Sequence, residues 1–302
     1  MRRVCDRRGM VSVEGSPLRA PGRGGGRDGE GRGGGWDVWE GRARRGTAAA
    51  CFTGLTVSLS VPLFVVMLLI SPFVYALDRR RRRAHHVLNW TWAAWSTWPF
   101  YRIRVIDADR YLHGVGEGSG VAPAAVIVAN HQSYLDVYAL FHLRYPFKFV
   151  SKQSIFLVPF IGWSMFLTGH VMLRRGDKTG RSQTAMMARC RSLLRHGVPV
   201  CIFPEGTRSR TGELGEFKLG AFRLACETGA PIVPVTIRGT RRGGFLCSGS
   251  DERGADGITV MVHPPISPAS CGSDPRRLAQ LARAAIASGL RADAANEREM
   301  FS

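Results

Sequence analysis

The sequence contains a stretch of 32 residues, 46–77, without a charged side chain. Its centre, residues 55–70, is mostly apolar, and about 20 apolar residues are enough to cross the hydrocarbon core of a bilayer. The stretch is too long, and starts too far from the N-terminus, for the core of an ordinary signal peptide. Pro62 and Pro72 would bend a helix here, which membrane helices tolerate better than soluble ones. We predict a transmembrane helix over about residues 52–77; a buried core helix is the alternative.

Five consecutive arginines, Arg79–Arg83, follow this stretch directly after Asp78. Arginines at the end of a membrane helix stay among anionic headgroups and bias that end to the side where translocation stops. The next segment, residues 85–101, holds four of the seven tryptophans: Trp90, Trp92, Trp95 and Trp98. Indole side chains favour the membrane–water interface, so we predict an interfacial helix over this segment. A buried aromatic cluster is the alternative.

The N-terminal segment, residues 1–46, holds 13 of the 36 glycines and shows no apolar periodicity. Such a segment cannot bury enough apolar surface to offset its ordering entropy, so we predict that it is disordered. It is rich in arginine, as organelle transit peptides are, but it is poor in serine and contains acidic residues. A transit peptide and a compositional bias of an unstructured tail are both open interpretations.

The chain has a formal net charge of +19 and an isoelectric point near 10.8, which favours an anionic partner. Nucleic acid, anionic lipid and a phosphorylated substrate all satisfy that condition. The charge is spread, with +5 on residues 1–77, +4 on residues 78–101 and +10 on the remainder, so it does not form one nucleic-acid-binding tail. The seven cysteines are scattered and form no C-x-x-C motif, which argues against a disulfide scaffold and against a zinc site.

From residue 102 onward, short apolar runs alternate with amphipathic stretches that often end at glycine. This alternation predicts an α/β fold, a mostly parallel sheet flanked by helices, preceded by the N-terminal membrane helices. We therefore divide the chain into a tail (1–46), a membrane anchor (47–101) and an α/β domain (102–302). The predicted strands are residues 124–129, 198–203, 231–237 and 258–262, and the predicted helices are residues 179–196, 218–228 and 275–295.

Chemically useful side chains follow two of these strands, at the carboxyl ends where sites in parallel sheets gather. His131 stands after the first strand, with Asp136 five residues later. Five positions on a helix are about 140° apart, so the two side chains meet only if His131 precedes the helix and Asp136 lies in its first turn. The carboxylate would then fix the imidazole tautomer and stabilise the imidazolium. A structural histidine in a capping loop is the alternative.

Two further segments carry arginines next to strands. Residues 203–210 form a Glu-Gly turn followed by arginines, and residues 171–175 form an apolar run that ends in two arginines. The planar fork of arginine matches phosphate oxygens, so both segments suit a phosphate or a polar headgroup. A solvated turn and a surface charge pair are the respective alternatives.

Taken together, these segments resemble the glycerolipid acyltransferase family, which includes the 1-acylglycerol-3-phosphate acyltransferases. The family's first block, N-H-x-S-x-x-D, matches Asn130, His131, Ser133 and Asp136. Its second block matches Lys152, Pro159, Gly162 and Arg175, and its third, F-P-E-G-T-R-S, matches residues 203–209 without a gap. The F-K-x-G-A and V-P-V elements follow at residues 217–221 and 233–235. The resemblance covers about residues 85–265, and residues 71–86 and 151–157 are similar to the plastid-type members.

The resemblance implies transfer of an acyl chain from acyl-ACP or acyl-CoA to the sn-2 hydroxyl of lysophosphatidic acid, which gives phosphatidic acid. It implies His131 as the general base and Asp136 as the residue that orients it. The substrate-binding residues implied are Glu205, Gly206, Thr207, Arg208, Arg175 and Lys152. Backbone N–H groups near the helix start after His131 are the expected oxyanion donors. We expect Ser133, the rival nucleophile, to act as a cap.

The same resemblance implies no metal and no cofactor apart from the acyl thioester as co-substrate. The expected partners are acyl carrier protein or coenzyme A thioesters, lysophosphatidic acid and membrane lipids, without nucleic acid. The expected location is integral in a plastid membrane, the chloroplast inner envelope, with an endomembrane as the alternative. Another acceptor, glycerol-3-phosphate or a different lysophospholipid, remains open. A non-catalytic membrane-anchored basic protein is a second alternative, and a hydrolase is a third, although the sequence lacks G-x-S-x-G.

Overall fold

The structure is a computed structural model that describes residues 34–113, 124–177, 179–209, 211–241 and 257–299. The chain divides into two units, residues 1–39 and 40–302, and the second holds the sheet with the helices that cover it. The disorder and the transit peptide expected at the N-terminus concern mainly residues 1–33, which lie outside the described residues.

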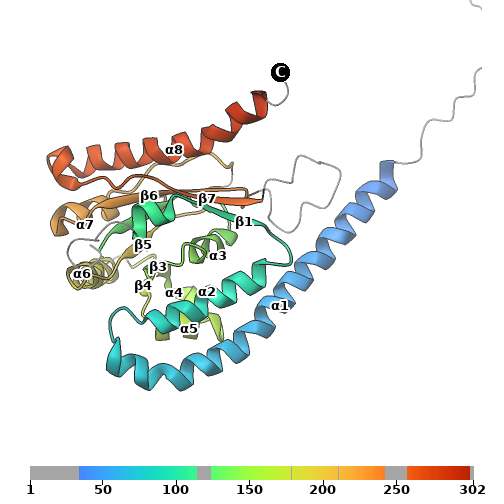
Figure 1. Ribbon diagram of the computed structural model, residues 1–302, viewed down its shortest axis with the longest axis horizontal. Coiled ribbons are helices and arrows are strands. Elements are labelled where there is room, and N and C mark those ends of the chain that lie inside the picture. Colours follow the sequence, from blue (N-terminus) through green and yellow to red (C-terminus); the bar gives the residue numbers. More distant parts are fainter. Residues whose placement is uncertain (1–33, 114–123, 178, 210, 242–256, 300–302) are drawn as a thin grey trace, which may run out of the picture. The chain divides into compact units, whose positions relative to one another are not determined.

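A seven-stranded sheet with the order β1-β7-β6-β2-β5-β3-β4 forms the centre of the second unit (Figure 1). Neighbouring strands are parallel except for β6 and β7, which confirms the predicted mostly parallel sheet. Strands β1, β3 and β4 were not predicted. They are short, and β3 begins and ends with lysine. The strands are β1 (Ile103–Ile106), β2 (Val126–Ala129), β3 (Lys148–Lys152), β4 (Val171–Leu173), β5 (Val200–Ile202), β6 (Ile232–Arg238) and β7 (Ile258–Val262).

Two apolar cores cover the two faces of the sheet, and β2 contributes to both. Successive side chains of a strand point to opposite faces. Accordingly Ile127 and Ala129 pack in the core with α3, whereas Val126 and Val128 pack in the core with α6, α7 and α8. All four are fully buried, which explains the uninterrupted apolar run. The helices of the two layers are α2 (Arg83–Thr97), α3 (Leu135–Phe141), α4 (Gln153–Phe156), α5 (Ile161–Thr168), α6 (Arg181–Arg195), α7 (Gly220–Thr228) and α8 (Pro275–Glu299).

The apolar stretch forms most of α1 (Gly34–Leu77), which bends along its course (Figure 1) and contains Pro62 and Pro72. Among the described helices it is the one long and apolar enough to cross a membrane, over Gly46–Leu77 with a mean hydropathy of 2.4. The helix begins earlier than predicted, at Gly34 within the last glycine run, so residues 34–46 are helical rather than disordered. A transmembrane position for α1 stays a prediction.

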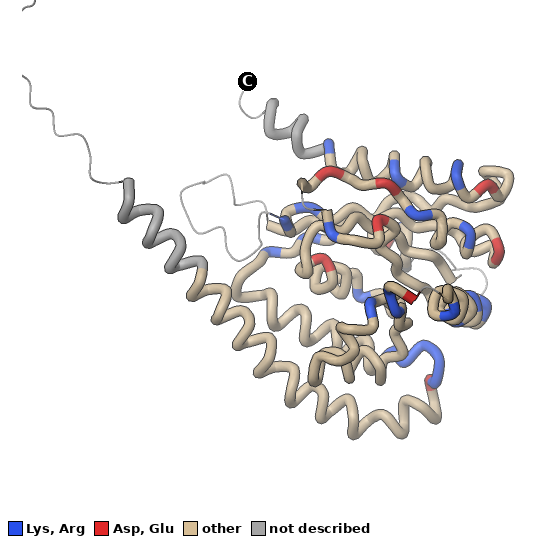
Figure 2. The backbone as a smooth tube through the Cα atoms, turned by 180° about the vertical axis from the view of Figure 1, so that it is seen from behind, with Lys and Arg blue, Asp and Glu red and all other residues tan. Residues whose placement is uncertain are grey.

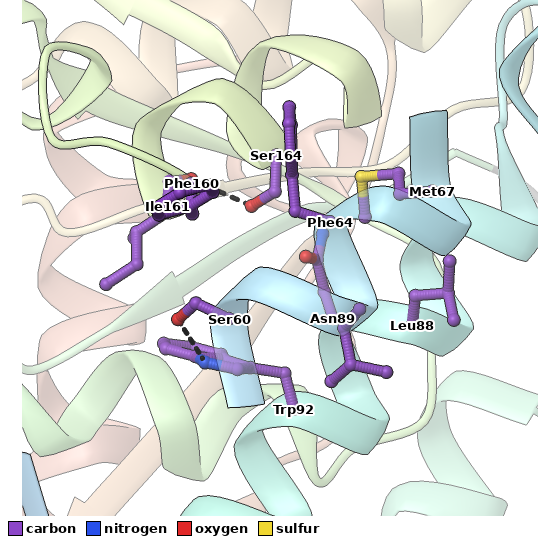
Figure 3. Close-up of a pocket in the computed structure, with 10 residues that line it drawn as sticks. Ser60, Phe64, Met67, Leu88, Asn89, Trp92, Phe160, Ile161 and Ser164 are labelled. Carbon is purple, nitrogen blue, oxygen red and sulfur yellow. Dashed lines mark hydrogen bonds between the residues drawn. The ribbon is translucent and has the colours of Figure 1, made fainter. Parts of the chain in front are cut away.

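Helix α1 packs against α2 and α5, as the close-up in Figure 3 shows. The Trp92 indole donates a hydrogen bond to the Ser60 hydroxyl at 3.1 Å, and the Phe64 ring contacts the ring of Phe160 at a centroid distance of 5.8 Å. A narrow cavity of about 20 Å³ remains among these side chains. Trp92 therefore serves tertiary packing, whereas Trp95 and Trp98 are exposed. The interfacial position predicted for α2 stays a prediction.

A buried lysine connects the loop between α1 and α2 to the sheet. Lys148, at the start of β3, is 1% exposed, and its ammonium donates to the carbonyl oxygens of Arg81 (2.6 Å) and Thr168 (2.7 Å). Burial, together with the charges of Arg82 and Arg189, lowers the pKa of Lys148 to about 7. Lys148 therefore links the loop to the sheet, but its positive charge is only marginally stable in this buried position.

We expect the stability of the protein to rise between pH 7 and 8.5 because of Lys148. In this range the folded protein has lost the Lys148 proton, whereas the unfolded chain keeps it up to about pH 10.5. Unfolding then takes up a proton, and the free energy of unfolding increases by roughly 1–2 kcal/mol. Thermal unfolding of the wild type in detergent should show this rise, Lys148→Met should flatten it, and Lys152→Met, on the same strand, should retain it. An unchanged rise in Lys148→Met would contradict the assignment.

Candidate active site

His131 and Asp136 meet at the carboxyl end of β2. His131 follows the strand and Asp136 lies in the first turn of α3, which begins at Leu135. Their atoms Nδ1 and Oδ2 are 2.7 Å apart; the imidazole is 18% exposed and the carboxylate is fully buried. Because a carboxylate only accepts hydrogen bonds, Nδ1 carries the proton and the lone pair of the ring lies on Nε2. The spacing in the sequence thus predicts the geometry of this dyad correctly.

The carboxylate of Asp136 also organises the backbone around it. Its Oδ2 atom accepts hydrogen bonds from the backbone N–H groups of Gln132 (2.7 Å) and Ser133 (2.8 Å) in addition to the imidazole. These two amides are therefore occupied, and the expectation that the first N–H groups after His131 serve as oxyanion donors is wrong for them. The Ser133 hydroxyl is buried and accepts the N–H of Leu135 at 3.3 Å, as a capping side chain does.

Two further contacts position His131, one on its imidazole ring and one on the loop that carries it. The ring of Phe203, just after β5, stacks on the His131 ring with a centroid distance of 4.0 Å and an interplanar angle of 17°. Asn130 is buried and exchanges two hydrogen bonds of 2.8 Å with the backbone of Ile237, which ties the start of the loop to β6. The sequence shows Phe203 and Asn130 only as members of matched blocks and gives no indication of these contacts.

Glu205 joins the loop after β5 to the loop after β2. Its carboxylate is buried, and Oε1 accepts the backbone N–H of His131 at 2.8 Å while Oε2 accepts that of Gly215 at 3.1 Å. The N–H of Ser209 donates to the carbonyl oxygen of His131 at 2.7 Å, which gives a second link. Glu205 therefore positions the backbone of His131. Direct contact of Glu205 with substrate stays a prediction.

The turn at Gly206 brings a lysine close to the backbone. Gly206 has φ = +73°, and a β-carbon built there would lie 2.7 Å from Nζ of Lys218. A side chain at position 206 would be strained and would displace Lys218. The next residues, Thr207 and Arg208, are exposed at the same edge of the sheet. Lys218 thus adds a positive charge next to the Glu205–Arg208 turn, although it is not among the predicted site residues.

Lys152 and Arg175 lie further along the same edge. Lys152 ends β3 and Arg175 follows β4, and both side chains are exposed. Because β2, β5, β3 and β4 are parallel neighbours, the residues after them line one edge in that order. The structure therefore brings all the predicted site residues to one edge. It shows no contact of Lys152 or Arg175 with the dyad among the described residues.

The proline and glycine of the second block shape the segment between β3 and β4. A β-carbon at Gly162 would lie 2.4 Å from the backbone carbonyl oxygens of Ile155 and Phe156, so only glycine allows α5 to approach α4 this closely.

Among the described residues, no group of three or more His, Cys, Asp or Glu side chains is placed to hold a metal ion. The absence of a metal and of a cofactor stays a prediction.

Comparison with known proteins shows the family of this chain. A family model with the description Acyltransferase matches residues 102–238. A 1-acyl-sn-glycerol-3-phosphate acyltransferase of Chlamydomonas reinhardtii is 44% identical over 243 residues, which are 80% of this chain and 69% of the relative. The chain belongs to the acyltransferase family. The matched residues 102–238 include His131 and Asp136, as the resemblance of the motifs implies.

Two more relatives of this acyltransferase agree with the family and the fold. The chloroplastic 1-acyl-sn-glycerol-3-phosphate acyltransferase LPAT1 of Arabidopsis thaliana is 42% identical over 229 residues, which are 76% of this chain and 60% of the relative. The crystal structure of the 1-acyl-sn-glycerophosphate (LPA) acyltransferase PlsC from Thermotoga maritima matches with a TM-score of 0.55 and 22% identity. That match covers 80% of this chain and 96% of the solved chain, and it supports the fold.

Proposed function

We propose that this acyltransferase moves an acyl chain from acyl-ACP or acyl-CoA to the sn-2 hydroxyl of 1-acylglycerol-3-phosphate and so produces phosphatidic acid. The observation that carries the proposal is the His131–Asp136 pair on a sheet edge that also bears Lys152, Arg175 and Arg208. A base beside several cations suits an acceptor that has both a hydroxyl and a phosphate. The names of the algal and plant relatives support the same acceptor.

In the proposed mechanism, Nε2 of His131 removes the proton of the acceptor hydroxyl as its oxygen attacks the thioester carbonyl carbon. The tetrahedral intermediate then collapses, the carbon–sulfur bond breaks, and His131 returns the proton to the leaving thiolate. Asp136 keeps the imidazole in the required tautomer and stabilises the imidazolium formed in between. The substrate hydroxyl is the nucleophile, so the mechanism needs no acyl-enzyme, and Ser133 keeps its capping role.

The proposed substrate contacts follow from the position of each side chain along the edge. Arg208 lies in the loop after β5, which Glu205 ties to the backbone of His131. We assign Arg208 to the phosphate of the acceptor together with Arg175 and Lys152. Guanidinium groups bind phosphate oxygens in pairs, which would orient the glycerol backbone toward Nε2. Gly206 allows the backbone to approach the ligand, and Thr207 supplies a hydroxyl beside it.

We further propose that the protein works at a plastid membrane. Acceptor and product are both lipids, and α1 exposes large apolar side chains along its length, with Leu69, Phe73 and Leu77 at 68–87% exposure. Two exposed tryptophans of α2, Trp95 and Trp98, are suited to the interface. The chloroplastic names of the plant relatives support the plastid as the location.

Replacement of Arg208 by alanine tests the assignment of the acceptor. We expect the KM for lysophosphatidic acid to rise roughly 10- to 100-fold, because a charge-assisted hydrogen bond contributes about 1.5–3 kcal/mol. The KM for the acyl thioester should stay within about twofold. The measurement is a membrane-fraction assay with labelled acyl-ACP or acyl-CoA and varied acceptor.

Arg277→Ala, on the exposed side of α8, is the matched control and should keep both constants. An effect of Arg208→Ala on the thioester alone would overturn the assignment of Arg208. If the wild type acylated glycerol-3-phosphate and left lysophosphatidic acid unchanged, the proposed acceptor would be wrong.

A further inference from the structure

A second basic site lies between the arginine loop, residues 78–83, and helix α6. A cavity of about 330 Å³ separates the two, and Figure 2 shows their blue segments next to each other. Every lining side chain can donate a hydrogen bond and none is a carboxylate; they are Arg79, Arg80, Arg82, Arg189, Ser192 and His196. This composition is suited to a small anion with several oxygen acceptors.

The arginine loop has a fixed backbone. The Asp78 carboxylate accepts the backbone N–H groups of Arg81 (3.2 Å) and Arg83 (2.9 Å), and Lys148 binds the carbonyl oxygen of Arg81. The Arg82 guanidinium donates to the carbonyl oxygen of Leu167 at 2.6 Å, and its carbon lies 4.4 Å from the ring centroid of Tyr75. The backbone of the loop and the Arg82 side chain are therefore in place before any ligand binds, which lowers the entropy lost on binding.

The described carboxylates offset the positive charge around this cavity only in part, through the effect of Asp78 on the pKa of Arg82. The Asp78 carboxylate is used by backbone amides, and no described Asp or Glu forms an ion pair with Arg79, Arg80 or Arg189. Burial lowers the pKa of Arg82, and the charges of Arg189 and Arg79 lower it further, which reflects their mutual repulsion. An anion in the cavity would relieve that repulsion.

This cavity is separate from the active site. Helix α6 begins after the carboxyl end of β4 and ends at Arg195, five positions before β5 starts at Val200. Its C-terminal half, with Arg189, Ser192 and His196, therefore lies toward the amino ends of the parallel strands. His131 follows the carboxyl end of β2, at the opposite edge of the sheet.

We propose that this cavity is a second binding site and that its ligand is a phosphate group. Guanidinium forks match phosphate oxygens, and the Ser192 hydroxyl can complete the shell. The group could come from the headgroup of an anionic phospholipid or from a soluble phosphate. The loop follows α1 directly, so a membrane headgroup would reach it if α1 lies in the bilayer.

Thermal unfolding of the full chain in detergent, at constant ionic strength, tests the site. The probes are inorganic phosphate and dioctanoyl phosphatidylglycerol, with dioctanoyl phosphatidylcholine as the zwitterionic control. We expect saturable stabilisation by at least one probe and an apparent affinity at least roughly tenfold weaker in Arg189→Ala. Arg80→Ala, as an independent variant, should weaken it as well. Saturation by phosphatidylglycerol alone identifies a headgroup site, and saturation by inorganic phosphate identifies a site open to soluble phosphates.

Two matched variants distinguish binding by the side chains that line the cavity from a general attraction of anions to positive charge. Arg195→Ala removes the same charge from the same helix end but does not line the cavity, and Arg208→Ala removes a cation of the active site. Both should keep the affinity within about twofold of the wild type. Equal weakening by Arg195→Ala and Arg189→Ala, loss of binding in Arg208→Ala, or no saturation by either probe would each overturn the proposal.

Discussion

Replacing His131 by alanine is expected to lower the rate of phosphatidic acid formation by about 10²–10⁴-fold, the range that a positioned general base contributes. The imidazole is the one group of the described edge whose lone pair is directed by a buried carboxylate, at 2.7 Å. The loss should appear in kcat, with little change in the KM for the acceptor, because the arginines that we assign to the phosphate remain. The assay compares initial rates of wild type and variant in membranes with equal protein content.

The folded state of His131→Ala must be verified in parallel. The removed ring is partly exposed and its backbone links to Glu205 and Ser209 persist, so the thermal midpoint and membrane association should stay close to the wild type. Ser133→Ala separates the rival mechanism, and we expect it to lose less than about tenfold because its hydroxyl serves a cap. Full activity in His131→Ala, or complete loss in Ser133→Ala alone, would refute the general-base mechanism.

Replacing Asp136 by asparagine is expected to have the second-largest effect, again about 10²–10⁴-fold in kcat. An amide oxygen at the position of Oδ2 would keep the hydrogen bonds from Gln132 and Ser133 but would remove the charge that stabilises the imidazolium. The amide nitrogen would occupy the position of Oδ1, which is buried and has no partner among the described residues. An unsatisfied buried donor would lower stability by about 1–3 kcal/mol.

The kinetic and thermal effects of Asp136→Asn distinguish positioning from a purely structural role. A structural role predicts a lower thermal midpoint with a near-normal kcat below that midpoint, whereas orientation of His131 predicts a loss of kcat at every temperature. Asp274→Asn is the matched control, since Asp274 is an exposed carboxylate at the start of α8 that accepts the N–H of Arg276. It should keep kcat, and an equal loss in Asp274→Asn would contradict the special role of Asp136.

Some elements of the fold are readable from the sequence because their signals are local. The uninterrupted apolar runs identify β2, β5 and β6, and β7 has the predicted bounds. The five-residue spacing of His131 and Asp136 predicts their contact, because a loop and one helical turn have little freedom over that distance. The missed strands are as short as three residues, and so brief an apolar run carries no periodicity.

Contacts between segments distant in sequence were decided by the tertiary structure. Glu205 reaches the backbone of His131 and Phe203 stacks on its ring because β2 and β5 are neighbours in the sheet although β3 and β4 lie between them in the chain. The same packing sets Arg189 beside the arginine loop. The sequence by itself determined the family, the dyad and the apolar helix, since these depend on residue type and local spacing. Only the tertiary structure decided which amides and charges face each other, because strand order and helix packing depend on the whole core.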